Sequence, residues 1–106
     1  MTTHPWLRHY DAGVPASLAP YPERILLDCV DDAVRARPDA TALHFKGMNV
    51  SWGTLTRESD AFACALAAMS VTRGDRVAVL LPNCPQFFVV EWAVWKLGAT
   101  LVPLNP

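Results

Sequence analysis

The stretch Gly74–Pro106, GDRVAVLLPNCPQFFVVEWAVWKLGATLVPLNP, decides the fold of this 106-residue chain. Val77–Leu81 is a continuous apolar run, which is typical of a parallel strand buried on both faces. Pro85 suits the first turn of a following helix, because no backbone donor is needed at that position. The segment 87–97 therefore predicts a crossover helix, and Gly98 is placed to terminate it.

The chain then returns at Thr100–Leu104, which predicts a second strand and completes a βαβ unit with parallel strands. A two-stranded parallel sheet leaves both edges and at least one face uncovered. The crossover helix is apolar nearly all the way round, and such a helix normally needs cover on most sides. Both features predict that the chain is an incomplete part of a larger α/β domain.

Upstream patterns add a helix, a hairpin and a second helix to this unit. A first helix is predicted over 23–37 from its apolar spacing. A short β-hairpin follows, with strands at 42–45 and 49–51 around a turn that contains glycine. Ser51 is placed to cap a helix over 52–69. The buried stripe of this capped helix is expected to consist of Leu55, Phe62, Leu66 and Met69.

The first 22 residues differ from the rest in composition, with four prolines and three aromatic residues. Prolines at that density disfavour regular helix or strand. Three aromatic side chains are too many for a purely solvated tail, so we expect them to dock on a body or on another subunit. The chain is therefore divided into an extended Pro/aromatic N-terminal arm, 1–22, and an α/β subdomain, 23–106.

Composition excludes several classes of function. The net charge of −1 gives no electrostatic reason to expect nucleic acid or an anionic membrane as a partner. The start of the chain shows no apolar signal-peptide core, and the longest apolar run falls short of the ~20 residues that span a bilayer. Cys29, Cys64 and Cys84 form no metal-binding motif, and we expect three small buried hydrophobic side chains in a reducing cytoplasm.

Three segments together resemble the N-terminus of the adenylate-forming, AMP-binding superfamily. They are ARPDATALHFKGMNVSWGTL (36–55), RGDRVAVLLPNCPQF (73–87) and WKLGATLVPLNP (95–106). Within this superfamily, the opening HPWLRHYDAGVPASL (4–18) is similar to that of long-chain fatty acyl-CoA synthetases. Ser70 departs from the pattern, because the family often has a helix-ending glycine at that place.

The resemblance implies a ligase that uses ATP, Mg²⁺ and CoA. A fatty acid and ATP would form an acyl-adenylate and pyrophosphate, and the CoA thiol would then displace AMP. The phosphate loop and the other catalytic motifs of the family find no match here, so we expect no catalytic, cofactor-binding or metal-binding residue and no bound cofactor. Two alternatives stay open: an adenylate-forming ligase for a medium-chain, aryl or amino acid, and a non-catalytic interaction module. The resemblance also implies a cytoplasmic enzyme, with peripheral membrane contact as an option for the whole protein.

Four residues invite a catalytic interpretation that their positions do not favour. His4, His9 and His44 are far apart in the sequence, and His44 lies in a strand with alternating apolar residues. Asn83 follows the carboxyl end of a predicted strand, where open α/β sheets place ligands. Because it precedes Cys84 and Pro85, we interpret Asn83 as part of a turn or a helix cap.

Three aspartates and two glycines could also suggest a binding site, but their spacing favours structural roles. The carboxylates of Asp28, Asp31 and Asp32 are spread around a helix, which indicates a solvated face and not a cation site. Gly74 precedes a strand, and its spacing from Gly98 fits neither phosphate-binding glycine motif. The sequence therefore predicts no site residue in these groups.

The apolar helix and the open sheet edges also predict self-association. Monomers rarely expose apolar patches of more than a few hundred Å². We expect a homodimer or higher oligomer, with arm exchange through Trp6 and Tyr10 as a second contribution.

Overall fold

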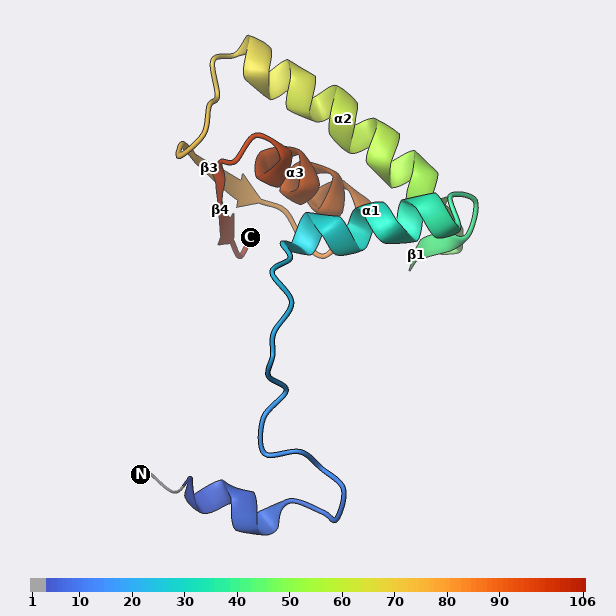
Figure 1. Ribbon diagram of the computed structural model, residues 1–106. Coiled ribbons are helices and arrows are strands. Elements are labelled where there is room, and N and C mark those ends of the chain that lie inside the picture. The colour runs from blue at the N-terminus through green and yellow to red at the C-terminus, as the bar shows by residue number, and fades with distance from the viewer. Residues whose placement is uncertain (1–3) are drawn as a thin grey trace.

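The computed structural model describes residues 4–106, which form an extended arm and a body of helices and strands (Figure 1). In this described range the body consists of α1 (Leu26–Ala36), β1 (Thr41–Phe45), β2 (Met48–Ser51), α2 (Trp52–Ala68), β3 (Arg76–Leu80), α3 (Pro85–Lys96) and β4 (Thr100–Leu104). β1 and β2 pair antiparallel, and β3 and β4 pair parallel. The predicted α/β class, with a hairpin and a βαβ unit, is confirmed.

The central element is α3, which contacts α2, α1 and both strands of the parallel pair (Figure 1). Pro85 occupies its first turn, and Gly98 follows its end with a φ of 68°. The β3–β4 register runs from Arg76 opposite Thr100 to Leu80 opposite Leu104. The expectation of burial on both faces of β3 is wrong: Val79 is buried against the body, whereas Leu80 is 61% exposed, because nothing in the described residues covers the other face.

Two hydrophobic clusters meet at α3. One joins Ala63 and Leu66 of α2 to Ala93 and Val94 of α3 and to Ala99. The other joins Val30 of α1, Leu55 of α2 and Trp92 of α3, with partly buried hairpin residues packed around them. The helix that is apolar on most sides is thus the core element of the body.

The stripe of α2 that is buried differs from the predicted one. Leu55, Ser59, Ala63 and Leu66 are buried, whereas Phe62 and Met69 are exposed. The small side chains of Ser59 and Ala63 allow α3 to pack closely, so the helix turns this narrow stripe inward rather than the bulkier one. Ser51 caps α2 as predicted, since its Oγ accepts a hydrogen bond from the Thr54 N–H at 3.2 Å.

The start of α1 and the cysteines also depart from expectation. α1 begins at Leu26, not at residue 23, because Ile25 is extended and its N–H donates to the Asp28 carboxylate at 2.9 Å. Cys29 and Cys64 are exposed and Cys84 is partly buried, so the expectation of three buried thiols is wrong.

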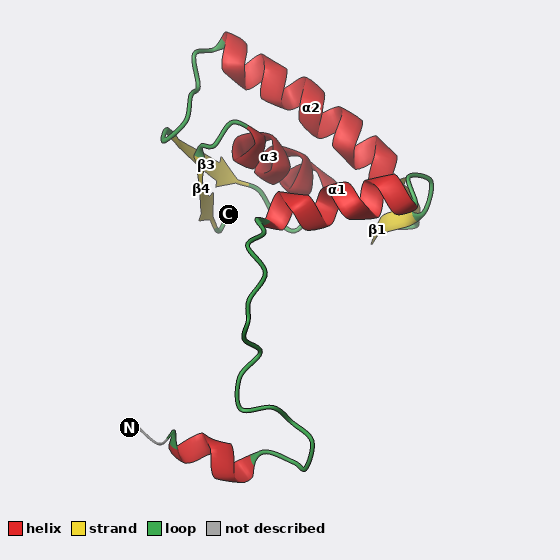
Figure 2. Ribbon diagram, viewed as in Figure 1, coloured by secondary structure: helices red, strands yellow, loops and turns green. Residues whose placement is uncertain are grey.

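The arm contains a short 3-10 helix, η1 (Pro5–His9), and then runs to the body without regular structure (Figure 2). The prediction of no helix in this segment is therefore wrong over these residues, since a proline at the first turn of a helix lacks only a donor that would stay unpaired. Trp6 is 53% exposed, and Tyr10 and Tyr21 are exposed as well. The expected docking of these aromatic rings on the body does not occur in this structure. Within residues 4–106 no helix is long and apolar enough to cross a membrane.

The C-termini of α2 and α3 form the same hydrogen-bonded motif with different residues. After α2, Ser70 donates to Ala67 O at 2.9 Å and Val71 donates to Leu66 O at 3.0 Å. After α3, Gly98 and the next residue make the equivalent bonds to Trp95 O and Val94 O. Both central residues have a φ of 68°, which costs a residue with a Cβ about 1–2 kcal/mol and costs glycine little.

Ser70→Gly should therefore raise the free energy of unfolding by about 0.5–1 kcal/mol, measured by urea denaturation, after allowance for the greater freedom of glycine in the unfolded chain. Gly98→Ala is the matched reverse change. It should lower stability by about 1–2 kcal/mol, and a Cβ there would lie 3.1 Å from Arg73 Cγ. If the urea midpoint were unchanged in both variants, the proposed backbone strain at residues 70 and 98 would be contradicted.

Candidate functional site

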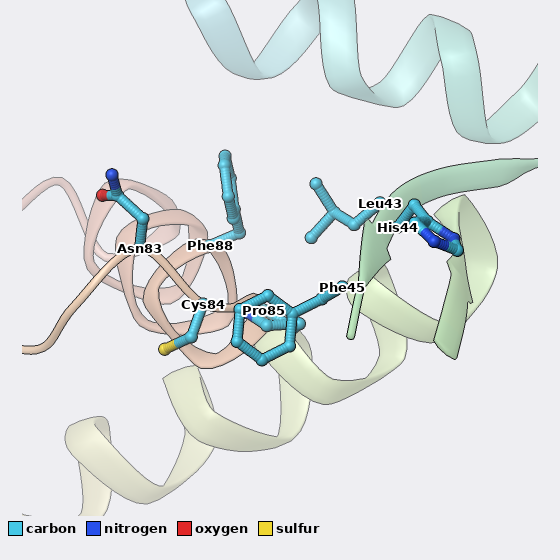
Figure 3. Close-up of a pocket in the computed structure, with 7 residues that line it drawn as sticks. All are labelled: Leu43, His44, Phe45, Asn83, Cys84, Pro85 and Phe88. Carbon is cyan, nitrogen blue, oxygen red and sulfur yellow. The ribbon is translucent and has the colours of Figure 1, made fainter. Parts of the chain in front are cut away.

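A shallow hollow of about 150 Å³ lies at the carboxyl end of β3, between the hairpin and the first turn of α3 (Figure 3). The β3–α3 turn and α3 supply one wall, and β1 supplies the other. The residues that line it are Leu43, His44, Phe45, Asn83, Cys84, Pro85 and Phe88. Asn83 and His44, which lie far apart in the sequence, thus line the same hollow, but they lie at opposite ends of it (Figure 3). Asn83 lies at the carboxyl end of β3, where open α/β sheets place ligands.

The chemistry of this hollow is mostly apolar. The Leu43, Phe45 and Phe88 side chains form its walls, and none of the lining residues is an acid, a lysine or an arginine. His44 Nδ1 lies 2.6 Å from Asn49 Oδ1, so that ring nitrogen is already engaged. Phosphate binding requires cationic groups or a cradle of backbone donors. The hollow can accept a small apolar group, but it does not fit the phosphates of ATP or a Mg²⁺ ion.

The remaining histidines lie on the arm, away from His44. His4 stacks on Trp6 with ring centroids 4.5 Å apart, and His9 accepts a hydrogen bond from Arg8 Nε at 3.1 Å. Among the described residues no three side chains of His, Cys, Asp or Glu come together in a way that could hold a metal ion. The three histidines therefore form no common site.

Of the three acidic residues of α1, Asp28 and Asp32 have structural roles, and Asp31 is exposed to solvent. Asp28 caps the helix, as described above. Asp32 accepts a hydrogen bond from Arg24, which raises the pKa of the Arg24 guanidinium, and its other carboxylate oxygen lies 3.3 Å from Arg35 Nη2. The contact with Asp32 ties Arg24, which precedes α1, to the helix, and among residues 4–106 no cluster of acids that could hold a cation is found.

Gly74 and Gly98 meet at the opposite end of the sheet from the hollow. The Gly74 N–H donates to the Gly98 carbonyl at 3.0 Å, and both residues have positive φ angles of 88° and 68°. This contact joins the turns that lead into β3 and β4. The two glycines therefore shape the sheet, and they do not form a phosphate cradle.

A polar contact that the sequence reasoning missed joins α2 to α3. Lys96 Nζ donates to Ser59 Oγ at 2.6 Å and lies 2.7 Å from Asp60 Oδ1. The Lys96 side chain is 21% exposed, and Ser59 is fully buried. Lys96 is one of two charged residues that interrupt the apolar pattern of α3, which is the only sequence signal that pointed to this contact.

Glu91 is the other interruption, and it has no comparable partner. Among residues 4–106 no hydrogen bond or ion pair to its side chain is found, and partial burial raises the pKa of its carboxyl group. The folded chain therefore holds a proton on Glu91 at pH values where the unfolded chain has already released it. Stability from this group falls as pH rises through that interval.

Glu91→Gln should consequently be more stable than the unmodified chain at pH 7 and should differ from it less at pH 4. Urea unfolding of both proteins across that range provides the measurement. The difference between the two curves isolates Glu91 from the other carboxylates. The prediction would be wrong if the difference in the free energy of unfolding between the two proteins grew toward acid pH. That result would mean that the surroundings of Glu91 favour its charged form.

Comparison with known proteins is consistent with this fold. The sequence profile described as "AMP-binding enzyme" matches residues 30–106, and the chain belongs to that family. Long-chain-fatty-acid–CoA ligases are among its relatives: that of Bacillus subtilis is 34% identical over 96% of this chain, and that of Escherichia coli O6:H1 is 31% identical over 95%. The chain spans about 18% of the length of these curated relatives.

Solved structures place the same fold in adenylate-forming enzymes. The N-terminal subdomain of Klebsiella oxytoca NpsA, in complex with 3-hydroxyanthranilyl-AMSN, superposes with a TM-score of 0.72 at 29% identity and covers 76% of this chain and 21% of its own. VinN in complex with L-aspartate gives a TM-score of 0.71 at 33% identity, over 74% of this chain and 20% of its own. The expected membership of the adenylate-forming superfamily is therefore confirmed.

Proposed function

We propose that this chain is part of an ATP-dependent ligase that joins a long-chain fatty acid to CoA. The observation that carries the proposal is the extent of the match to long-chain-fatty-acid–CoA ligases. An alignment over 96% of the chain must include most of the arm, 1–22. The crotonobetaine/carnitine–CoA ligase of Salmonella paratyphi A matches 71% of the chain, and NpsA matches 76%. The arm thus favours the long-chain class over the other adenylate-forming enzymes.

The proposed reaction has two steps. The fatty acid carboxylate attacks the α-phosphorus of ATP and releases pyrophosphate, and the CoA thiol then attacks the acyl carbon and releases AMP. Mg²⁺ and cationic side chains would offset the negative charge on the phosphates. The hollow at the end of β3 lacks such groups. We therefore assign the catalytic, ATP-binding and metal-binding residues to parts of the enzyme other than residues 4–106.

The 106-residue chain alone should not activate fatty acids. Incubation with ATP, Mg²⁺, oleate and CoA is expected to release no pyrophosphate above a protein-free blank, because the hollow at the end of β3 has no lysine or arginine for the ATP phosphates. Pyrophosphate release can be followed by a coupled phosphate assay, with an intact long-chain ligase as the positive control. Turnover by the isolated chain would contradict the assignment of all catalytic groups to the rest of the enzyme.

The substrate has a second candidate, an aryl or amino acid, which the complexes of NpsA with 3-hydroxyanthranilyl-AMSN and of VinN with L-aspartate favour. Assay of the parent polypeptide with oleate, a medium-chain fatty acid, 3-hydroxyanthranilate and L-aspartate separates the classes. We expect the highest kcat/KM for oleate. No adenylation of any acid by the parent would favour the third candidate, a non-catalytic interaction module.

The proposal extends to organisation and location. Residues 1–22 form the arm and 23–106 the subdomain, and the free thiols of Cys29, Cys64 and Cys84 suit a reducing cytoplasm. The exposed face of the β3–β4 pair and the exposed aromatic rings of the arm support a homodimer or higher oligomer of the chain. Nucleic acid is not among the proposed partners, because the net charge is −1.

A further inference from the structure

The apolar pattern of α2 allows two ways of packing this helix against α3 (Figure 1). The stripe expected from the sequence adds Phe62 and Met69 to two leucines. The stripe that is buried adds Ser59 and Ala63 to the same two leucines. At about 100° per residue, the centres of the two stripes lie only about 45° apart around the helix axis. A small rotation of α2 about its own axis would therefore exchange one stripe for the other.

A polar contact lies on one flank of α2, beside the stripe that is buried. Lys96 Nζ donates to Ser59 Oγ at 2.6 Å and lies 2.7 Å from Asp60 Oδ1. It also lies 3.5 Å from the Thr56 carbonyl oxygen, to which Ser59 Oγ donates at 2.9 Å. Around the helix axis, Phe62 lies on the other flank. A rotation that turned Phe62 toward α3 would thus carry Ser59 and Asp60 away from Lys96.

The polar contact discriminates between the two stripes more sharply than apolar burial does. Hydrophobic stabilisation is non-directional and roughly proportional to the buried area, so two stripes that share two leucines differ little in this respect. Hydrogen bonds depend strongly on distance and angle. Ser59 is fully buried and the Lys96 side chain is only 21% exposed, so separating these groups would leave buried polar atoms without partners. Buried polar residues fix the register of helices in this way in coiled coils.

We infer that Lys96 fixes the rotation of α2 on α3 by selecting the Ser59 stripe over the bulkier Phe62 stripe. The rotation of α2 also places the hairpin, because β2 ends at Ser51 and α2 begins at Trp52. The hairpin forms one wall of the hollow at the end of β3, and the first turn of α3 forms part of the other. Lys96 is therefore a positioning residue for the hollow. These contacts lie between two helices of one chain, and they depend neither on what covers the exposed faces of the body nor on the ligase reaction.

The double variant Ser59→Ala/Lys96→Met tests the role of the polar contact. It removes the hydroxyl and the ammonium group together, so neither is left buried without the other. The variant should keep the helical circular dichroism of the unmodified 106-residue chain, since replacing a buried polar pair by apolar side chains is often neutral for stability. Its amide NMR signals should nevertheless double or broaden along α2 and α3 and at the hollow residues 43–45 and 83–88.

Contacts between methyl groups measure the rotation itself. In the unmodified chain, nuclear Overhauser effects should join the Ala63 methyl to methyl groups of α3, because these residues belong to one buried cluster. In the double variant these effects should weaken by about twofold, as expected for two arrangements of similar population, and new effects should join the Phe62 ring to α3. Lys46→Met is the matched control. Lys46 is exposed at the hairpin turn, so this variant should keep one set of signals.

Phe62→Ala, added to the double variant, separates selection of a stripe from simple loss of stability. It removes the bulkiest member of the competing stripe, so one set of signals and the full Ala63 effects should return. The same recovery is expected if the double variant is too loosely packed to give resolved signals. One set of signals with undiminished Ala63 effects in the double variant would overturn the inference. A triple variant that is no better ordered than a disordered double variant would overturn it as well.

Discussion

Trp92→Ala should lower the free energy of unfolding by about 3–5 kcal/mol, the largest effect expected of a single substitution in this chain. Trp92 is 5% exposed and packs against Val30 of α1 and Leu55 of α2. Its ring also stacks on Trp52, with centroids 6.1 Å apart and planes 6° from parallel. Because a domain of this kind is typically stable by about 5–15 kcal/mol, the substitution takes the body close to unfolding. Thermal and urea denaturation followed by circular dichroism would measure the loss.

Trp6→Ala is the matched control for the same change of side chain. Trp6 lies on the arm and is half exposed, so its loss should change stability by less than about 0.5 kcal/mol. Trp95 is only partly buried, and Trp95→Ala should fall between the two. Equal stability of the Trp92 and Trp6 variants would contradict the central position of α3 in the core.

Lys96→Met should lower the free energy of unfolding by about 1.5–3 kcal/mol, the range for hydrogen bonds to a charged group that is partly buried. Methionine keeps most of the length of the lysine stem, so the change removes the contacts of Nζ with Ser59 and Asp60 more than it removes packing. Urea unfolding at pH 7 measures the difference.

Asp60→Asn separates the two contacts of Lys96. The Asp60 side chain is 60% exposed, and exposed ion pairs contribute about 0–1 kcal/mol, so this variant should lose much less than Lys96→Met. Full stability in Lys96→Met would mean that dehydration of the ammonium group cancels the hydrogen bonds it makes, as happens for some buried ion pairs. In that case the α2–α3 contact would rest on apolar packing, in which Ala63 and Leu66 meet Ala93 and Val94, and Leu55 meets Trp92.

The local signals in the sequence predicted the elements and their order well. Pro85 and Gly98 marked the ends of α3, and Ser51 marked the start of α2, because proline, glycine and a capping hydroxyl act through backbone geometry within one turn. The apolar run before Pro82 predicted a strand for the same local reason. These features need no information from the rest of the chain.

The choice of buried face could not be predicted in the same way. In α2, the stripe with Phe62 and Met69 is the bulkier, yet Ser59 and Ala63 are the residues turned toward α3. The apolar run of β3 suggested burial on both faces, whereas α3 covers one. Burial depends on which neighbour arrives and how closely it packs, and that is a property of tertiary contacts.

The candidate site also divides into features that the sequence determined and features that only tertiary packing determined. The sequence by itself determined the family, through three short motifs that resemble it, and it determined the βαβ unit, through backbone-specific residues. Only the tertiary structure placed His44 and Asn83 in the lining of one hollow, and only the tertiary structure brought Lys96 to Ser59, 37 residues away in the chain. Such pairs depend on the packing of whole helices and strands, because the side-chain patterns of each element specify a buried face but not the partner that will cover it.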